Sequence, residues 1–437
     1  MKKLTGIIIG AGSRGGGYAN LMKEMPDAYS IVGVAEPVKE RNDRIKNMFN
    51  IKDENCYTSW EYILDRPKFA DFAVIATQDA MHFEPAMKAL ELGYDLLLEK
   101  PISPSPEECR IIAETAEKYG RKVIVCHVLR YTKLYKTVKS VLMSGRIGEI
   151  MSVEWLEAVG NKHMSHSFVR GHWRNKEESC AMILAKSCHD LDAIQWLIGK
   201  KCKKVQSFGS LGFFKKENKP EGAPERCIDG CPHAESCPYD TAKLYQGEGA
   251  MGGNWFRSAA TDTVVPTEQQ VENALRNTRY GKCVFSSDNN VVDHQVVNME
   301  FEGGATVSFT MTGLTPDGMG RMFRFYCTKG MLEVGAKNNI VYLTEFEKHK
   351  EGFTTKVTEE IDVSRIEDAG GIGITSGHGG GDGGIIAALY EELNGTYTGF
   401  SVSTARESYL NHLLSFAAEE SRLNGTVIDI DEFAKLN

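Results

Sequence analysis

The residues that decide the fold stand near the N-terminus, in the run Thr5-Gly6-Ile7-Ile8-Ile9-Gly10-Ala11-Gly12-Ser13-Arg14-Gly15. An apolar strand pattern is followed at once by G-x-G-x-x-G, which in a Rossmann fold joins the first strand to the first helix. Gly10 permits the tight turn, Gly12 lets the backbone approach a pyrophosphate, and Gly15 lets helix and strand pack closely. Backbone N–H groups at Ser13 and Arg14 then face the phosphates. The motif predicts a dinucleotide-binding domain.

An acidic residue completes this fingerprint. Glu36 ends the second apolar run, Ile31 to Ala35, about twenty residues after the glycines. A carboxylate there accepts hydrogen bonds from the adenosine ribose and repels a 2′-phosphate, so NAD is predicted over NADP. Lys39 and Arg41 lie just beyond and could weaken this preference.

The first 128 residues alternate strand and helix patterns, which predicts a doubly wound parallel sheet. Ser105-Pro106-Glu107-Glu108 is a capping box that opens a helix, and Gly120 ends it. We therefore predict a Rossmann domain over residues 1–128. Beyond Thr5 to Ile9 and Ile31 to Ala35, its strands are expected at Phe72 to Ala76, Asp95 to Leu98 and Lys122 to Cys126.

From residue 129 the periodicity changes. After a helix at Lys133 to Met143, alternation with a two-residue period predicts antiparallel strands. We predict an α+β domain over residues 129–437 with an open, mostly antiparallel sheet. Its expected strands are Val291 to Phe301, Ala305 to Thr312, Met322 to Cys327 and Val427 to Ile430, the last preceded by a helix at Ala405 to Leu423. Residues from 215 to about 280 have little periodicity and are expected to be an insertion with too few apolar residues to fold alone.

Length and composition set the class of protein. A chain of 437 residues with 42% hydrophobic and 25% charged residues is typical of a two-domain globular protein. The formal net charge of -8 with no basic run predicts no nucleic-acid partner, and no apolar stretch is long enough to predict a membrane span. The N-terminus lacks the pattern of a signal peptide, so eleven cysteines are expected as thiols in the cytoplasm.

Three cysteines cluster in the insertion, in the spacing Cys227-x3-Cys231-x5-Cys237. Closely spaced thiolates suit a structural Zn²⁺ or an iron–sulfur centre. The fourth ligand is open among Cys283, Cys202 and His233, and Cys283 is preferred because it follows the insertion. Ordinary reduced thiols are the competing interpretation.

Four further motifs resemble one known family. They are Leu98-Glu99-Lys100-Pro101, the stretch from Ala76-Thr77 to His82, Ser144-Gly145-Arg146-Ile147-Gly148, and His189 with Asp192. In their order along the chain, these motifs resemble the glucose–fructose oxidoreductase, inositol dehydrogenase and rhizopine-catabolism (Gfo/Idh/MocA) family. The resemblance implies a Rossmann domain joined to an open sheet, a homo-oligomer (dimer or tetramer) formed through that sheet, and sugar-like substrates.

The resemblance also implies roles for residues. Lys100 would polarise or position the reacting oxygen, with Glu99 orienting it, and Thr77, Gln78 and His82 would line the cofactor site. His189 would be the acid/base for the substrate hydroxyl, a role that suits an imidazole near neutral pH.

The sequence departs from the family pattern one helical turn before His189. Many members carry Asp at the position of Ala185. Lys186 follows, and in one continuous helix it would lie within a turn of His189. We therefore count Lys186 with Lys100 as a catalytic candidate and expect two neighbouring ammonium groups, one with a depressed pKa.

Other polar residues are candidates for substrate binding. His166, Arg170 and Trp173 belong to a stretch rich in His and Arg, which either lines a pocket or is an exposed loop. Arg130 and Tyr131 fall at the domain junction. His378 lies in a glycine-rich run that is either a loop beside the ligand or a plain linker.

These observations favour an NAD-dependent oxidoreductase that moves hydride to or from a secondary carbinol of a sugar, polyol or sugar derivative. Two alternatives remain open. One is a glycosidase or lyase that retains NAD and works by oxidation, elimination and reduction. The other is a non-catalytic sensor that binds NAD.

Overall fold

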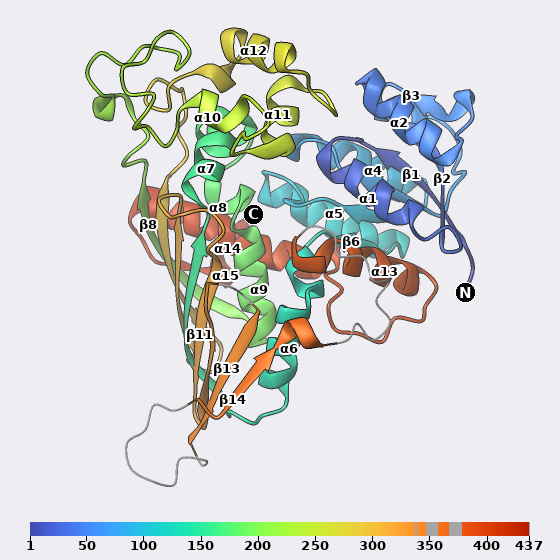
Figure 1. The fold of residues 1–437 in the computed structure, drawn as a ribbon. Coiled ribbons are helices and arrows are strands. Elements are labelled where there is room, and N and C mark those ends of the chain that lie inside the picture. Colours follow the sequence, from blue (N-terminus) through green and yellow to red (C-terminus); the bar gives the residue numbers. More distant parts are fainter. Residues whose placement is uncertain (337–338, 347–356, 367–377, 437) are drawn as a thin grey trace.

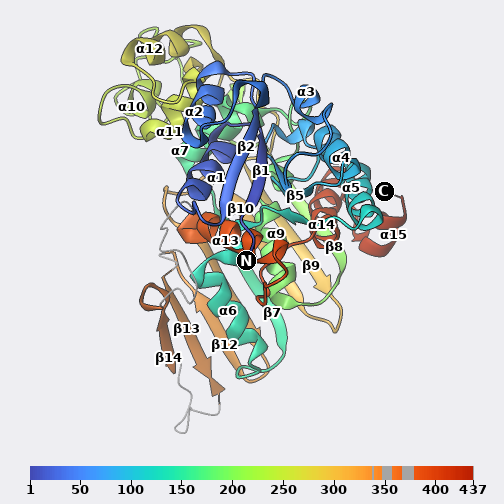
Figure 2. The same cartoon turned by 90° about the vertical axis from the view of Figure 1, so that its right-hand side faces the viewer.

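Two sheets form the framework of the protein (Figure 1). The computed structural model describes residues 1–437 except 337–338, 347–356, 367–377 and 437. The parallel sheet of the first domain lies on one side of the molecule, and the larger second sheet extends away from it (Figure 2). Helix α14 (Ala405–Asn424) runs between them and contacts α5 of the first domain and β8 of the second.

The first sheet has the strand order β3-β2-β1-β4-β5-β6, and every pairing in it is parallel. This is the doubly wound arrangement that the sequence predicts. Its strands are β1 (Leu4–Ile9), β2 (Tyr29–Ala35), β3 (Cys56–Tyr57), β4 (Phe72–Ile75), β5 (Asp95–Leu98) and β6 (Val123–Val125). Its helices are α1 (Ser13–Lys23), α2 (Lys39–Phe49), α3 (Trp60–Leu64), α4 (Phe83–Glu91) and α5 (Pro106–Tyr119).

The N-cap and C-cap predicted for α5 are confirmed, but the full capping box does not form, because the Ser105 N–H donates to the Ser103 hydroxyl and not to Glu108. The Ser105 hydroxyl accepts a hydrogen bond from the Glu108 N–H, and Pro106 occupies the first helical turn. Gly120 ends the helix with φ of 59°, in the left-handed region that favours glycine.

The second sheet has nine strands in the order β14-β13-β12-β11-β7-β10-β9-β8-β15. Among the described strands of this second sheet, only the pairing of β10 with β7 is parallel. The prediction of a mostly antiparallel sheet is therefore confirmed. The strands are β7 (Ile150–Ala158), β8 (Cys202–Ser210), β9 (His294–Phe301), β10 (Thr306–Thr312), β11 (Gly320–Cys327), β12 (Gly330–Val334), β13 (Ile340–Glu345), β14 (Glu359–Asp362) and β15 (Ile428–Asp429).

Helices cover the side of this sheet that faces the first domain (Figure 1). In chain order they are α6 (Lys133–Met143), α8 (Met182–Ala185), α9 (Cys188–Ile198), α14 and α15 (Ile430–Leu436). Helix α7 (Asn161–His163) follows β7, and α13 (Gly381–Leu393) packs against α1 of the first domain. Between α7 and α8 the chain forms a π-helical turn at Met164–Arg170.

The chain returns to the first domain after the second sheet is built. Ile385, Ile386 and Leu389 of α13 join the core that holds Ile8 and Phe72. A backbone hydrogen bond from Val125 to Ser403 covers the edge of β6. A boundary at residue 128 therefore marks where the second domain begins along the chain, but not a clean division of the core.

The insertion lies between β8 and β9 and rises above the rest of the molecule (Figure 1). It contains α10 (Thr241–Tyr245), α11 (Gly253–Thr261) and α12 (Glu268–Asn277). The expectation that it has too few apolar residues to fold alone stays a prediction, but the insertion does contain a small core. Its helices enclose a separate cluster of buried residues: Leu244, Tyr245, Phe256, Ala260, Val271, Leu275 and Tyr280. These apolar residues are spread over three short helices, which hides their periodicity in the sequence.

Candidate active site

The glycine loop between β1 and α1 has the geometry that its motif predicts. Gly10 has φ of 87°, and a Cβ atom on Gly15 would lie 1.9 Å from the Gly10 carbonyl oxygen. A Cβ atom on Gly12 would meet no heavy atom within 4 Å. The backbone conformation at Gly10 and the close packing at Gly15 therefore require glycine. Gly12 leaves open space at the N-terminus of α1, where a phosphate can approach the backbone.

Glu36 is buried at the carboxyl end of β2, next to this loop. Its carboxylate accepts hydrogen bonds from the Ala11 N–H at 2.7 Å and the Val38 N–H at 2.9 Å. Each carboxylate oxygen can accept more than one hydrogen bond, so the group retains capacity for ribose hydroxyls. The position fits the predicted role in NAD binding.

A buried ion cluster ties the glycine loop to the Glu-Lys-Pro segment. The Arg14 Nε atom donates to Glu99 at 2.7 Å, and the Tyr18 hydroxyl donates to the same Glu99 oxygen at 2.6 Å. Arg14 also donates to both carboxylate oxygens of Asp382, at the start of α13. Burial raises the pKa of Glu99, but the charges of Arg14 and Lys100 outweigh it and hold the pKa below its usual range. Arg14 and Glu99 thus connect the glycine loop to the Glu-Lys-Pro segment and to the start of α13.

Thr77 and His82, predicted at the cofactor site, shape the turn after β4. The His82 ring lies 2.8 Å from the Pro101 carbonyl and 3.2 Å from the Thr77 carbonyl. The Thr77 hydroxyl donates to the Met81 carbonyl, and Gln78 is exposed beside them. His82 therefore connects the turn after β4 to the Glu-Lys-Pro segment. Thr77 and Gln78 lie on the more exposed side of this turn.

Lys100 lies at the carboxyl end of β5 and reaches across the domain junction. Its ammonium donates to the Ala185 carbonyl at 3.2 Å. The expectation of one helix through residues 185–193 is wrong, because α8 ends at Ala185 and α9 begins at Cys188. The last carbonyl groups of a helix lack partners within it, and here one of them accepts the Lys100 ammonium. The helix break thus provides the carbonyl group that connects Lys100 to the second domain.

His189 lies near the start of α9 within a buried group of histidines. Its ring is 5.9 Å from the His127 ring, and the His127 ring is 5.5 Å from that of His412. Burial, with the charge of Lys100, lowers the pKa of His189 well below its ordinary value. The Nδ1 atom of His189 and both ring nitrogens of His127 are buried without a hydrogen-bond partner. Such orphaned atoms are costly in native structures and frequently mark functional sites.

Lys186 pairs with a carboxylate that the sequence does not indicate. Its ammonium lies 3.2 Å from the buried carboxylate of Glu157 on β7. Arg321, directly opposite on β11, pairs with Glu157 at 3.0 Å and with Asp190 at 2.7 Å. Lys186 is therefore one end of a buried ion-pair network with Glu157 and Arg321. The expectation of two neighbouring ammonium groups, Lys100 and Lys186, stays a prediction.

His163 and His378 lie in the same electrostatic environment as the two lysines. Burial lowers the pKa of His163 well below its ordinary value, and the charges of Lys186, Lys100 and His378 add to the effect. The His378 ring is 6.2 Å from the His189 ring and 3.1 Å from the Asp382 carboxylate. The structure thus brings Lys100, His189 and His378 together.

Four of the predicted substrate residues are buried in other interactions. Arg130 forms a bidentate pair with Asp192 at 2.7 and 2.8 Å, and Tyr131 packs in the first domain's core. His166 stacks on Phe256 at 3.8 Å, while Arg170 donates to the Lys282 and Tyr239 carbonyls. Because all four side chains are enclosed by protein, they support the junction or the insertion.

Trp173 instead links the two domains. Its indole N–H donates to Asp79 at 2.7 Å, and the Ser179 hydroxyl donates to the same oxygen at 3.1 Å. Asp79 lies in the turn after β4, so this contact holds the second domain against the edge where the cofactor residues gather.

The cysteines predicted to bind metal show no metal cage in the part of the chain that the structure describes. A backbone bridge between Arg226 and Lys282 brings the segments of Cys227 and Cys283 side by side, as the preference for Cys283 assumed. However, the Cys227 sulfur accepts from Arg170 at 3.8 Å, and Cys231 and Cys237 do not complete a ligand set. All eleven cysteines are free thiols.

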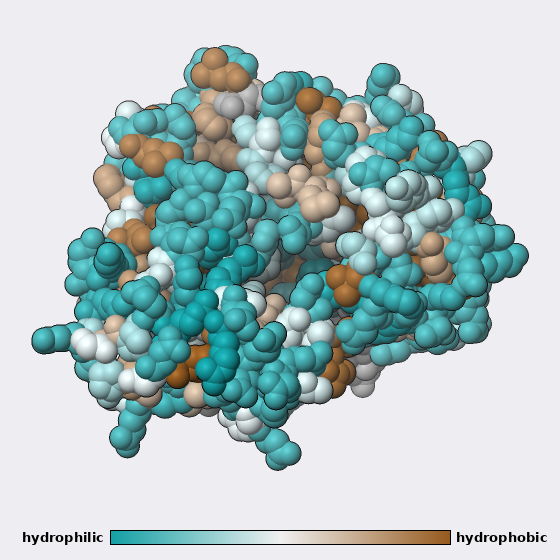
Figure 3. Space-filling view, turned by 90° about the horizontal axis from the view of Figure 1, so that it is seen from above, coloured by the Kyte–Doolittle hydropathy of each residue, from teal (hydrophilic) through white to brown (hydrophobic). Residues whose placement is uncertain are grey.

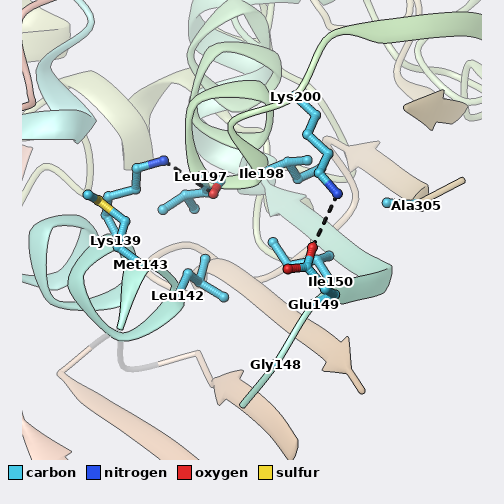
Figure 4. Close-up of a pocket in the computed structure, with 10 residues that line it drawn as sticks. All are labelled: Lys139, Leu142, Met143, Gly148, Glu149, Ile150, Leu197, Ile198, Lys200 and Ala305. Carbon is cyan, nitrogen blue, oxygen red and sulfur yellow. Dashed lines mark hydrogen bonds and ion pairs between the residues drawn. The ribbon is translucent and has the colours of Figure 1, made fainter. Parts of the chain in front are cut away.

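The surface offers two kinds of hollow. The mostly hydrophilic face seen in Figure 3 is hollowed near its centre. A separate pocket of about 150 Å³ lies between α6, the end of α9 and the start of β7, and Lys139 and Lys200 are among its lining residues (Figure 4). It contains none of the predicted site residues. None of the described helices has the length and apolarity needed to cross a bilayer.

Comparison with known proteins places this two-domain chain in a family. Residues 4–127 match the model of the NAD-binding Rossmann fold of the Gfo/Idh/MocA oxidoreductase family, and residues 139–398 match its C-terminal alpha/beta domain. The chain belongs to this family. Its first domain is therefore an NAD-binding Rossmann domain.

Curated relatives are distant. A Bacillus subtilis protein described as an oxidoreductase, YteT, is 22% identical over 271 residues, 60% of each chain. Inositol 2-dehydrogenase of Streptomyces avermitilis is 27% identical over 47% of this chain and 56% of its own. The 2,7-anhydro-N-acetylneuraminate hydratase of Mediterraneibacter gnavus is 26% identical over 48% of this chain and 53% of its own. The chain thus spans little more than half the length of these relatives.

Solved structures agree over nearly the whole chain. Levoglucosan dehydrogenase in complex with NADH and L-sorbose superposes with a TM-score of 0.70 at 17% identity, covering 98% of this chain and 99% of that one. The WlbA dehydrogenase of Chromobacterium violaceum, with NADH and UDP-GlcNAcA, gives a TM-score of 0.62 at 15% identity, covering 98% and 96%. At these identities the likeness establishes the fold alone.

Sequence reasoning missed His127, Glu157 and Arg321. His127 lies just beyond β6, at the carboxyl edge where ligands gather in such sheets, so its position could have revealed it. Glu157 and Arg321 meet only because β7 pairs with β11 across more than a hundred residues of chain, and no local pattern encodes that register.

The buried histidines predict a pH-dependent stability. Burial lowers the pKa of His127 to about 4 and that of His166 to about 3, from the ordinary value of 6.5. Below about pH 6.5 the unfolded chain binds more protons than the folded one, so the free energy of unfolding should fall as the solution becomes more acidic. Each such histidine contributes a slope of up to about 1.4 kcal/mol per pH unit.

His166→Phe tests this prediction, because phenylalanine can stack on Phe256 in the same place. Urea unfolding over a pH series from about 7 to about 4 should show a shallower loss of stability than in the unmodified protein. His233→Asn, at a half-exposed ring in the insertion, is the matched control. An unchanged slope in His166→Phe would contradict the assignment.

Proposed function

We propose that the protein is an NAD-dependent oxidoreductase that transfers hydride to or from a secondary carbinol of a sugar, polyol or sugar derivative. The carrying observation is that Lys100, at the carboxyl end of β5, donates to the Ala185 carbonyl across the domain junction, while its charge acts on the buried ring of His189. Relatives named inositol 2-dehydrogenase and neighbours named levoglucosan dehydrogenase support this substrate class.

The residues divide the work by their positions. NAD, when bound along Gly10 to Gly15 and Glu36, supplies the hydride acceptor or donor. Lys100 holds the reacting oxygen and stabilises negative charge on it, since its ammonium points into the junction. His189 takes or returns the hydroxyl proton, and its neutral resting form, favoured by burial, is the form that can accept one. The Glu99 cluster keeps Lys100 in place.

Turnover tests this proposal directly. The unmodified protein with NAD and a panel of polyols and sugars should form NADH, measured by absorbance. Lys100→Met and His189→Ala should each abolish turnover while NAD affinity stays nearly unchanged, because neither belongs to the dinucleotide fingerprint. Lys118→Met, at an exposed lysine of α5, is the control.

Several outcomes would refute it. Full activity in Lys100→Met would overturn the assigned mechanism. Conversion of sugars with no net NADH would favour the redox-neutral alternative, which a relative named as a hydratase makes worth distinguishing. Tight NAD binding without any conversion would favour a sensor.

The Lys186–Glu157 pair should tune this chemistry. We propose that it takes the place of the carboxylate missing at Ala185. Lys186→Met should cost at least about tenfold in turnover, the lower part of the range for lost acid–base assistance, and should remove one limb of the pH–rate profile. Lys186→Arg, which keeps the ion pair, should retain most of the rate. Unchanged turnover and pH profile in Lys186→Met would exclude a role.

Glu36 should set the choice of dinucleotide. Titration should show NAD binding more tightly than NADP, and Glu36→Ala should narrow the gap, because it removes the charge that repels a 2′-phosphate. Glu91→Ala, at the exposed end of α4, should leave the ratio unchanged. Tighter binding of NADP by the unmodified protein would contradict the assignment.

The oligomeric state and a structural metal are two further proposals. Exposed apolar side chains of the second sheet, such as Met151 and Phe208, support a homo-oligomer formed through that sheet. A structural zinc at the cysteines stays a prediction, and only the proximity of the Cys227 and Cys283 segments supports it.

A further inference from the structure

Trp255 is the exposed member of an aromatic group in the insertion. It lies on α11, where its neighbour Phe256 is 4% exposed, whereas Trp255 retains 48% of its surface. Tyr245 and Tyr280 of the same group are also buried. Burying an indole normally contributes substantially to stability, so one left open beside a buried cluster is an available contact surface.

This indole stands next to the candidate active site. Its ring is 5.1 Å from the His163 ring, which it meets nearly at right angles, and 5.5 Å from the His166 ring. His163 is the residue whose pKa responds to Lys100, Lys186 and His378. Trp255 therefore contacts a residue whose electrostatic surroundings include the charged groups of the proposed site.

The insertion is held over the cofactor domain, which fixes the position of Trp255. Asp262, at the end of α11, pairs with Arg41 of α2, and the Val264 N–H donates to Glu40 at 3.5 Å. Figures 1 and 2 show α11 above α7, with the insertion reaching α2. The insertion thus bridges the two domains.

The charges around Trp255 favour a neutral partner. Arg41 is paired with Asp262, Arg257 with Glu268, and Lys162 with Asp317. With these three cations engaged, the rim offers little to a phosphate group. The face of an indole ring is electron-rich and attracts weakly positive C–H groups, such as those on the apolar face of a pyranose ring.

We propose that Trp255 forms a second sugar subsite, so that the substrate is a glycoside or disaccharide whose reacting ring lies at Lys100 and His189 and whose second ring stacks on the indole. This inference rests on the proposed function. It gives the insertion a role in selecting substrates by length, because the insertion adds a binding surface beyond the reacting ring.

The test compares one-ring and two-ring ligands. Steady-state turnover of the unmodified protein should show a lower KM for a disaccharide than for its reacting monosaccharide. Trp255→Ala should raise the disaccharide KM about three- to tenfold, the range expected for one lost aromatic contact, with kcat and the monosaccharide KM unchanged. Trp255→Phe should recover part of the loss, and Tyr62→Ala, at an exposed aromatic of α3, is the control.

A binding measurement separates this proposal from the proposed function. Disaccharide added to the NAD-loaded protein should change the intrinsic tryptophan fluorescence, and Trp255→Phe should lose that change. Equal effects of Trp255→Ala on both ligands, or no effect on either, would overturn the second subsite while leaving the oxidoreductase assignment intact. Preferential, Trp255-dependent binding of a nucleotide sugar over a disaccharide would replace the neutral ring with a nucleobase and also overturn it.

Discussion

The buried carboxylate of Glu99 is the constraint on which the site depends. It accepts hydrogen bonds from Arg14 at the glycine loop, from Tyr18 of α1 and from the backbone N–H of Lys100, so one side chain connects the glycine loop to Lys100. A buried charge costs several kcal/mol unless it is paired and hydrogen-bonded. The fold meets that cost with Arg14, and Arg14 in turn holds Asp382, where the chain returns from the second domain. Cofactor loop, lysine and domain return are therefore set by one network.

The second domain contributes to the site through an irregularity in its helices. The interruption between α8 and α9 frees the Ala185 carbonyl for Lys100 and places His189 at the start of a new helix. A continuous helix would use that carbonyl within itself. In the same region Lys186 pairs with Glu157, so the carboxylate beside Lys186 comes from strand β7 and not from the preceding helical turn. A buried carboxylate thus lies beside Lys186 although position 185 is an alanine.

Much of this architecture follows from local sequence. The glycine fingerprint, the Ser105 N-cap of α5 and the alternation of β9 to β11 each encode a local geometry, and the structure reproduces them. The roles expected for His166 and Arg170 did not follow, because the same polar residues can line a pocket or anchor an insertion, and only tertiary packing distinguishes the two. The helix break at Lys186 and the register that joins Glu157 to Arg321 depend on contacts between segments far apart in the chain. Sequence periodicity cannot reveal such contacts.

Direct hydride transfer is the central claim, and isotope tracing tests it most directly. The protein would be incubated with an oxidised sugar and NADH that carries deuterium at nicotinamide C4, and the product would be examined by NMR. The account predicts deuterium on the new carbinol carbon, with a strong preference for one of the two C4 positions of NADH. Product without deuterium from either position would contradict the proposed oxidoreductase chemistry at Lys100 and His189.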